Sequence, residues 1–251
     1  MTVSEFSDQF DALVIASYRR FKNFDDKEEL DSVEFNEYEK SVFLTQAQEE
    51  LVLSLYNGRN SSLQSFEETE ELRRYLSGLI EEETISPIAN TGGKPIGIDS
   101  DKKTRFFSLP TDLWFITYES VKLDADDRPC AGIGNLEVVP VTQDEYHRIR
   151  KNPFRGANDR RALRLDLSED VVEIVSSYTV ESYYVRYLKK LSPIVLVDLP
   201  NGLTIGHRGL KTECQAHEGL HRRILELAVE KGLRSKFGGG SSTATNRTDR
   251  E

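Results

Sequence analysis

The spacing of apolar residues changes along the chain, and this change constrains the fold more than any other feature. Up to about residue 83, apolar side chains recur every three to four positions, as they do on one face of an α-helix. Residues 84–103 are rich in Pro, Gly and charge, and after them apolar and polar residues alternate with a period of about two. The sequence therefore predicts an α+β protein whose N-terminal part is helical and whose middle part is β-rich.

Helices are predicted where a capping side chain precedes helical spacing. Ser4, Asn36 and Ser65 are suitable N-caps for three N-terminal helices, and Thr142 is one for a short helix farther on. Gly232 suits the residue that follows the last helix, because glycine readily adopts the left-handed conformation there. The predicted helices cover residues 4–21, 36–56, 65–80, 143–150 and 216–231.

Strands are predicted between these helices, so we expect a helical bundle interrupted by a β-rich insertion. The bundle would comprise residues 1–83 and 211–232, the insertion residues 84–210, and an extended C-terminal tail residues 233–251. The tail ends in Gly, Ser, Thr and charged residues, which do not order by themselves, so we expect residues 238–251 to run along a neighbouring chain. The predicted strands cover residues 104–108, 113–121, 136–141, 161–167, 171–177, 182–188 and 194–199.

The net charge of −10 is unevenly distributed. Residues 1–83 hold 20 acidic and 8 basic residues, with the densest acidic run at 25–39, whereas the rest of the chain is close to neutral. An acidic chain with one basic segment is a poor general DNA binder, but unlike charges suit surfaces that meet between protein copies. The basic segment could instead contact phosphates of passing DNA, although Phe154 is its only aromatic residue. The predicted protein-interface residues are Arg148, Arg150, Lys151, Arg155, Arg160, Arg161 and Arg164.

Other patterns exclude several classes of protein. No apolar run approaches the ~20 residues of a membrane-spanning helix, and the N-terminus lacks the basic start and apolar core of a secretory signal. Cys130 and Cys214 are too few for a disulfide framework or a metal cluster, so we expect reduced thiols. Residues 90–95 resemble a phosphate-binding loop only faintly, because Pro95 stands where Ser or Thr would hold Mg²⁺.

His217, Glu218 and His221 form an H-E-x-x-H pattern, which on a helix can bind Zn²⁺ with the glutamate as general base. A zinc enzyme of this kind needs a third ligand on a later element, yet the acidic residues that follow, Glu226 and Glu230, fall on the same helix. We therefore expect no metal, no cofactor and no catalytic residues, and we interpret the pattern as a surface helix start that carries two polar histidines.

Three patches of the sequence resemble structural proteins of crAss-like tailed phages of Bacteroidetes. The first is EYEKSVFLTQAQEELV at 37–52, the second is DEYHRIRKNPFR at 144–155 followed by LRLDL at 163–167, and the third is YVRYLKK at 184–190 followed by PIVLVDL at 193–199. They keep the order of that family, whose members build rings in the neck between portal and tail. The helical and β-rich parts are also similar to those of portal adaptors of short-tailed phages.

The resemblance implies a structural virion protein, assembled in the host bacterial cytoplasm, that forms a closed ring of twelve copies. It implies contacts with the portal protein and other neck or tail proteins, and double-stranded DNA passing through the lumen without sequence-specific binding; no membrane is involved. Two alternatives remain: a zinc-dependent hydrolase using His217, Glu218 and His221, and a soluble DNA-binding module using residues 148–164.

Overall fold

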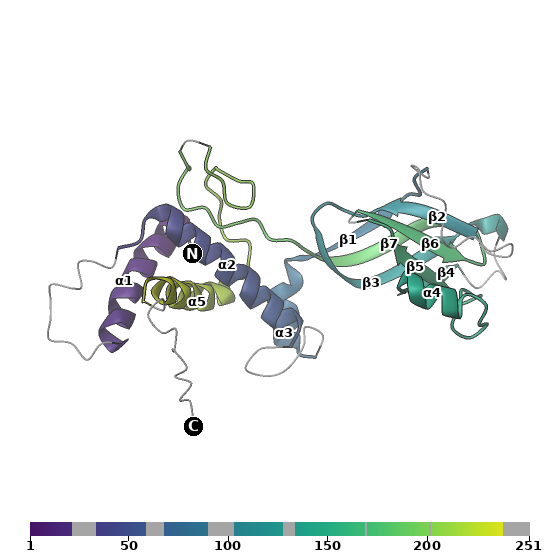
Figure 1. The fold of residues 1–251 in the computed structure, drawn as a ribbon, viewed down its shortest axis with the longest axis horizontal. Helices are drawn as coiled ribbons and strands as arrows, with labels where there is room; N and C mark the ends of the chain where they lie inside the picture. Colours follow the sequence, from purple (N-terminus) through teal and green to yellow (C-terminus); the bar gives the residue numbers. More distant parts are fainter. Residues whose placement is uncertain are drawn as a thin grey trace, which may run out of the picture. The chain divides into compact units, whose positions relative to one another are not determined.

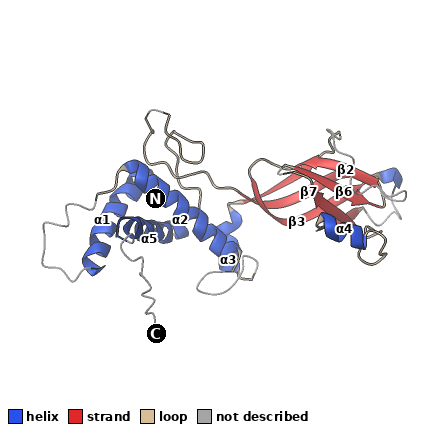
Figure 2. Cartoon of the chain, viewed as in Figure 1, coloured by secondary structure: helices blue, strands red, loops and turns tan. Residues whose placement is uncertain are grey.

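The computed structural model describes residues 1–21, 34–58, 68–89, 103–127, 134–168, 170–200 and 202–237, which form two compact units (Figure 1). Unit 1 comprises residues 1–79 and 191–251, and unit 2 residues 80–190. Helices dominate the first unit and strands the second (Figure 2), so the chain is a mixed α+β protein, as predicted. Residues 25–33, 90–95, Cys130 and the predicted tail contact of residues 238–251 lie outside the described residues.

Unit 1 contains α1 (Val3–Phe21), α2 (Glu37–Tyr56), α3 (Glu70–Ser77) and α5 (Glu218–Phe237). Helix α5 packs against both α1 and α2. The capping box predicted at the start of α2 is confirmed, because Asn36 Oδ1 accepts from the Glu39 amide at 2.8 Å and Glu39 Oε2 accepts from the Asn36 amide at 3.0 Å. None of the helices in the described part is long and apolar enough to span a membrane.

The cap predicted at Ser4 is wrong, and Ser65, the cap predicted for the third helix, lies outside the described residues. Thr2 caps α1 instead of Ser4: its Oγ1 accepts from the Glu5 amide at 3.3 Å, and its own amide donates to Glu5 Oε2 at 2.7 Å. The helix predicted at 65–80 is shorter than expected, since Thr69 caps α3. At the other end Ile80 already belongs to the first strand of unit 2, because it pairs in the sheet.

The predicted end of the last helix is also wrong, because α5 continues through Gly232 to Phe237. A Cβ atom on this glycine would lie 3.1 Å from Cζ of Phe35 and 3.5 Å from Cζ of Phe10. Phe10 and Phe35 are buried and stand edge to face, with ring centroids 5.5 Å apart. The glycine therefore serves close packing inside a helix and does not terminate it.

Replacing Gly232 with valine should destabilise unit 1 by about 1–3 kcal/mol, because the added methyl groups overpack a site closed by two buried rings. Gly78→Val is the matched control, since nothing lies within 4 Å of a Cβ atom at that position. Chemical denaturation compares the two variants. Equal unfolding midpoints would contradict the packing role of Gly232.

The segment that leads from the sheet to α5 is not a strand at residues 194–199, contrary to the prediction. Two of its amides donate to side chains of α2: the Ile194 amide to Thr45 Oγ1 and the Leu196 amide to Ser41 Oγ, both at 3.0 Å. Only Val195 forms a β-bridge, to Thr212. These bonds connect the segment to α2, and residues 191–210 belong to unit 1, although the sequence predicts them within the insertion.

Unit 2 is a seven-stranded sheet in the order β1-β7-β3-β4-β5-β6-β2. All pairs are antiparallel except β4 with β5, which are parallel and joined through α4 (Gln143–Ile149). Six of the predicted strands are confirmed, with shifted ends. Strand β1 was not predicted, because three consecutive glutamates hide its alternation of apolar and polar residues. The strands are β1 (Ile80–Ile85), β2 (Lys103–Ser108), β3 (Leu113–Leu123), β4 (Asn135–Pro140), β5 (Arg161–Asp166), β6 (Val171–Ser176) and β7 (Val180–Lys189).

The sheet has apolar side chains on both faces. A larger core includes Phe107, Leu123 and Tyr183, all fully buried. A smaller one joins Tyr146 of α4 to Leu163 and other residues of β5 and β6. The Thr142 cap of α4 is confirmed by its hydrogen bond from the Glu145 amide, and α4 thereby fixes the start of the basic segment that follows it.

Candidate interaction surfaces

The basic loop, residues 148–161, is held in shape by its own hydrogen bonds. Asn152 Oδ1 accepts from the amides of Phe154 at 2.9 Å and Arg155 at 3.3 Å, and the Asn152 carbonyl accepts from the Gly156 amide at 2.7 Å. A Cβ atom at Gly156 would lie only 2.8 Å from that carbonyl oxygen, so the turn requires glycine. Asn158 adds a bond from its Nδ2 to the Pro153 carbonyl at 3.2 Å. These hydrogen bonds therefore give the loop a defined backbone conformation.

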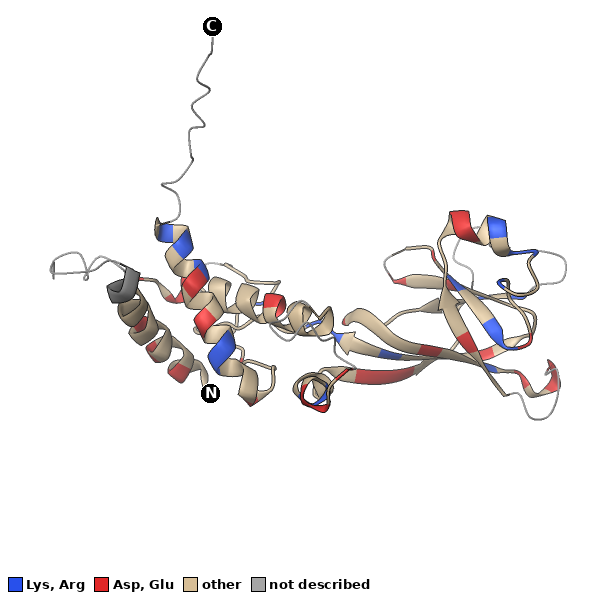
Figure 3. Cartoon of the chain, turned by 90° about the horizontal axis from the view of Figure 1, so that it is seen from below, with Lys and Arg blue, Asp and Glu red and all other residues tan. Residues whose placement is uncertain are grey.

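The loop carries the apolar ring of Phe154 in a stretch of sequence rich in Lys and Arg, whose positions along the backbone are coloured blue in Figure 3. Phe154 is 85% exposed, the largest exposed fraction among the large apolar residues of the described chain. Four predicted interface residues are exposed and make no ion pair within the described residues, while Arg150 and Arg161 are half-buried. These four are Arg148, Lys151, Arg155 and Arg160.

Arg164 differs from the other predicted interface residues because its guanidinium is engaged inside unit 2. Its Nη1 lies 2.9 Å from both carboxylate oxygens of Glu119, and its Nε lies 2.9 Å from Oδ1 of Asp166. Side chains of Arg164 and Glu119 are only 12% and 7% exposed, and the Tyr183 hydroxyl donates to the same carboxylate. Burial raises the pKa of Glu119, and Arg164 opposes that shift.

The two histidines of the H-E-x-x-H pattern lie in different surroundings. His217 precedes α5, is exposed, and accepts from the Gly219 amide at 3.1 Å through Nδ1. His221 is buried, not surface-exposed as expected: its Nδ1 is 3.0 Å from the Met1 amino group and its Nε2 is 3.0 Å from the Ala216 carbonyl. Within the described part of the chain, no group of three His, Cys, Asp or Glu residues is placed to hold a metal ion.

Cys214 lies half-buried beside α2 and donates from Sγ to Gln48 Oε1 at 3.2 Å. Burial raises the pKa of this thiol to about 11. The thiol therefore stays protonated at neutral pH, and its position does not favour nucleophilic chemistry.

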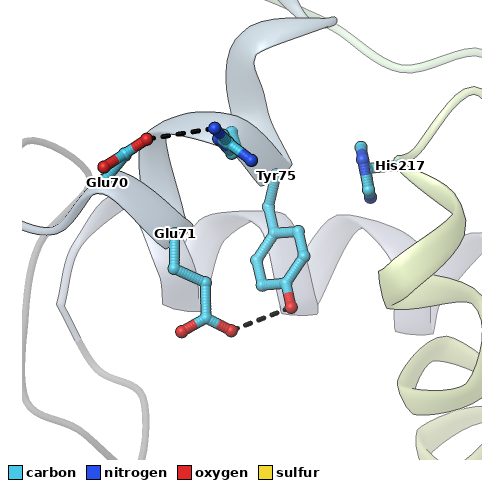
Figure 4. Close-up of a pocket in the computed structure, with 5 residues that line it drawn as sticks. Glu70, Glu71, Tyr75 and His217 are labelled. Atoms are coloured by element: carbon cyan, nitrogen blue, oxygen red, sulfur yellow. Dashed lines mark hydrogen bonds and ion pairs between the residues drawn. The ribbon is translucent and has the colours of Figure 1, made fainter.

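An open hollow of about 520 Å³ lies beside α3 and the start of α5 (Figure 4). The rings of Tyr75 and His217 form one part of its lining, with centroids 5.4 Å apart. Gly219 permits this packing, because a Cβ atom there would lie 2.9 Å from Cε1 of Tyr75. Glu70, Glu71 and Arg74 form the rest of the lining.

The charges around the hollow are partly paired. Arg74 Nη2 lies 3.2 Å from Glu70 Oε1. The Tyr75 hydroxyl donates to Glu71 Oε1 at 2.8 Å, and this hydrogen bond raises the pKa of the tyrosine. The exposed carboxylate can bind a cation, and the ring of the neutral tyrosine can pack against an aromatic group. The two side chains do not form an activated nucleophile. No sequence pattern predicted this site, because its two parts come from segments far apart in the sequence.

Comparison with known proteins gives three matches that cover most of the chain. The profile of the family described as phage tail ring protein 3/4 matches residues 1–245. Ring protein 3 of Bacteroides phage crAss001 is 43% identical over 237 residues, which cover 94% of this chain and 96% of that protein. Ring protein 4/5 of the same phage is 28% identical over 239 residues, covering 92% and 91%. The resemblance inferred from the sequence patches is confirmed, and it extends over both units.

Proposed function

Because this chain belongs to the phage tail ring protein 3/4 family, we propose that it is a structural virion protein that forms a ring in the head-to-tail neck of a crAss-like phage. The ring joins the portal to the tail. The observation that carries this proposal is the match to a named ring protein along nearly the whole of both chains. Virion assembly in the host bacterial cytoplasm follows from this role.

The ring closes through heterologous contacts, in which one surface of a copy meets a different surface of the next. The chain offers unlike surfaces for such a joint. Unit 2 carries the basic loop, and unit 1 carries the acidic side chains of α1 and α3. Twelve copies would match the portal, and the remaining faces bind the portal protein and other neck or tail proteins.

The ring lumen passes double-stranded DNA without sequence-specific binding and without an enzymatic step. A net charge of −10 limits attraction to phosphates. The basic loop has a single aromatic ring, which is too few for a base-stacking platform. Its exposed arginines and lysine therefore serve protein contacts better than DNA contacts, and no cofactor is needed for this mechanical role.

Removing the chain from the phage tests its place in the particle. We expect a null mutant to accumulate heads without attached tails, and a complementing tagged copy to restore infectivity and to be labelled at the neck in electron micrographs. Tailed particles in the null mutant, or a label on the capsid or the distal tail, would contradict the proposal.

A further inference from the structure

We propose that Phe154 of one copy inserts into the hollow formed by Glu70, Glu71, Arg74, Tyr75 and His217 of the next copy, and that Arg155 pairs with Glu71 there. This inference rests on the proposed ring function and specifies how two copies recognise each other. Phe154 and Arg155 are called the knob below.

The knob has the features of an interface anchor. Phe154 is almost fully exposed, although its burial would remove a large apolar area from water. The backbone amides of both knob residues donate to Asn152 Oδ1, and these bonds hold the backbone of the knob in its turn. Aromatic residues and arginine, presented on a rigid loop, are the residue types that most often dominate binding energy at protein interfaces.

The hollow complements the knob in shape and charge. Its volume of about 520 Å³ is large enough for an aromatic side chain together with part of an arginine. The Tyr75 and His217 rings can pack against a phenyl ring (Figure 4). Glu71 is exposed and uses one carboxylate oxygen for Tyr75, so the carboxylate can also accept from a guanidinium.

The knob and the hollow are different surfaces, located in unit 2 and unit 1 respectively. A joint between them is therefore not self-complementary, and each copy can use its knob toward one neighbour and its hollow toward the other. This is the contact type that generates closed rings when the rotation between copies closes. The charges agree with this direction, because Glu71 of the hollow is exposed whereas the basic loop is positive.

Single substitutions on either side should weaken assembly. Phe154→Ser and, separately, Glu71→Arg should each raise the protein concentration needed for half-maximal assembly by about 30-fold, as expected for an interface anchor. Leu210→Ser is the control, because Leu210 is also highly exposed but lies outside both surfaces. Combining Glu71→Arg with Arg155→Glu in one chain should restore assembly, since the pair of charges is exchanged.

A mixing experiment separates contact between copies from contact within one chain. Phe154→Ser copies keep an intact hollow and Glu71→Arg copies keep an intact knob, so the mixture has one working joint. Analytical ultracentrifugation should detect one-to-one pairs in the mixture and monomers of each variant alone. Unimpaired rings from both variants, or a mixture without pairs, would overturn the knob-and-hollow contact while leaving the proposed ring function in place. A wild-type protein that never assembles and is absent from the neck would overturn both.

Discussion

Replacing Arg164 with methionine should lower the free energy of unfolding by about 3–5 kcal/mol, because the variant leaves the Glu119 carboxylate buried without its cation. The exposed fractions of 12% and 7% place this pair in the interior of unit 2, and Arg164 contacts both carboxylate oxygens. The matched control is Arg222→Met, which breaks an exposed pair with Glu226 and should change stability by less than about 1 kcal/mol. Equal denaturation midpoints for the two variants would contradict the buried-pair account.

The pH dependence of the Arg164→Met variant provides a second readout. Burial already raises the pKa of Glu119 in the folded chain, and loss of Arg164 removes a group that lowers it. In the variant the folded state therefore holds a proton that the unfolded state releases, so stability should fall as pH rises from about 4 to the raised pKa of the folded state. Adding Glu119→Gln should abolish this slope. A slope that persists in the double variant would assign it to another group.

Reversing Arg160 and Arg161 to glutamate should slow assembly by roughly tenfold or more, because the reversed charges would repel the acidic surface that we propose the basic loop contacts. Circular dichroism should remain that of the wild type, since Arg160 is exposed and the hydrogen bond from Arg161 Nη1 to the Phe154 carbonyl is long, at 3.5 Å. Arg222→Glu with Arg223→Glu reverses two adjacent exposed arginines on α5 and is the control for net charge. Normal assembly into infectious particles would show that the interface role of the loop is wrong.

Local signals in the sequence predicted the elements whose cause is local. The capping box at Asn36 and the cap at Thr142 were found because a side chain and an amide three residues later suffice to form them. The helix end predicted at Gly232 was wrong, because the role of this glycine depends on Phe10 and Phe35, which lie far away in the sequence. Strand β1 and residues 194–199 were predicted wrongly for the same reason. The conformation of β1 depends on pairing with β7, and that of residues 194–199 depends on hydrogen bonds to α2, both far away in the sequence.

The interaction surfaces also include a part that the sequence predicted and a part that depends on contacts between distant segments. The charge pattern predicted the basic segment as an interface, and four of its members are exposed in the structure. The pattern could not separate Arg164 from its neighbours in sequence, because the partner that buries it, Glu119, lies on β3. It also could not identify the hollow, where Tyr75 and His217 meet only in the folded unit.

Projection imaging of the assembled protein tests the ring proposal most directly. Class averages of the purified protein and of the virion neck should show a closed ring with a central opening and cyclic symmetry, with twelve copies if the ring matches the portal. A tag on the chain should appear on that ring in the virion. Only monomers or open filaments in the purified sample, together with a neck that lacks the tag, would contradict the account.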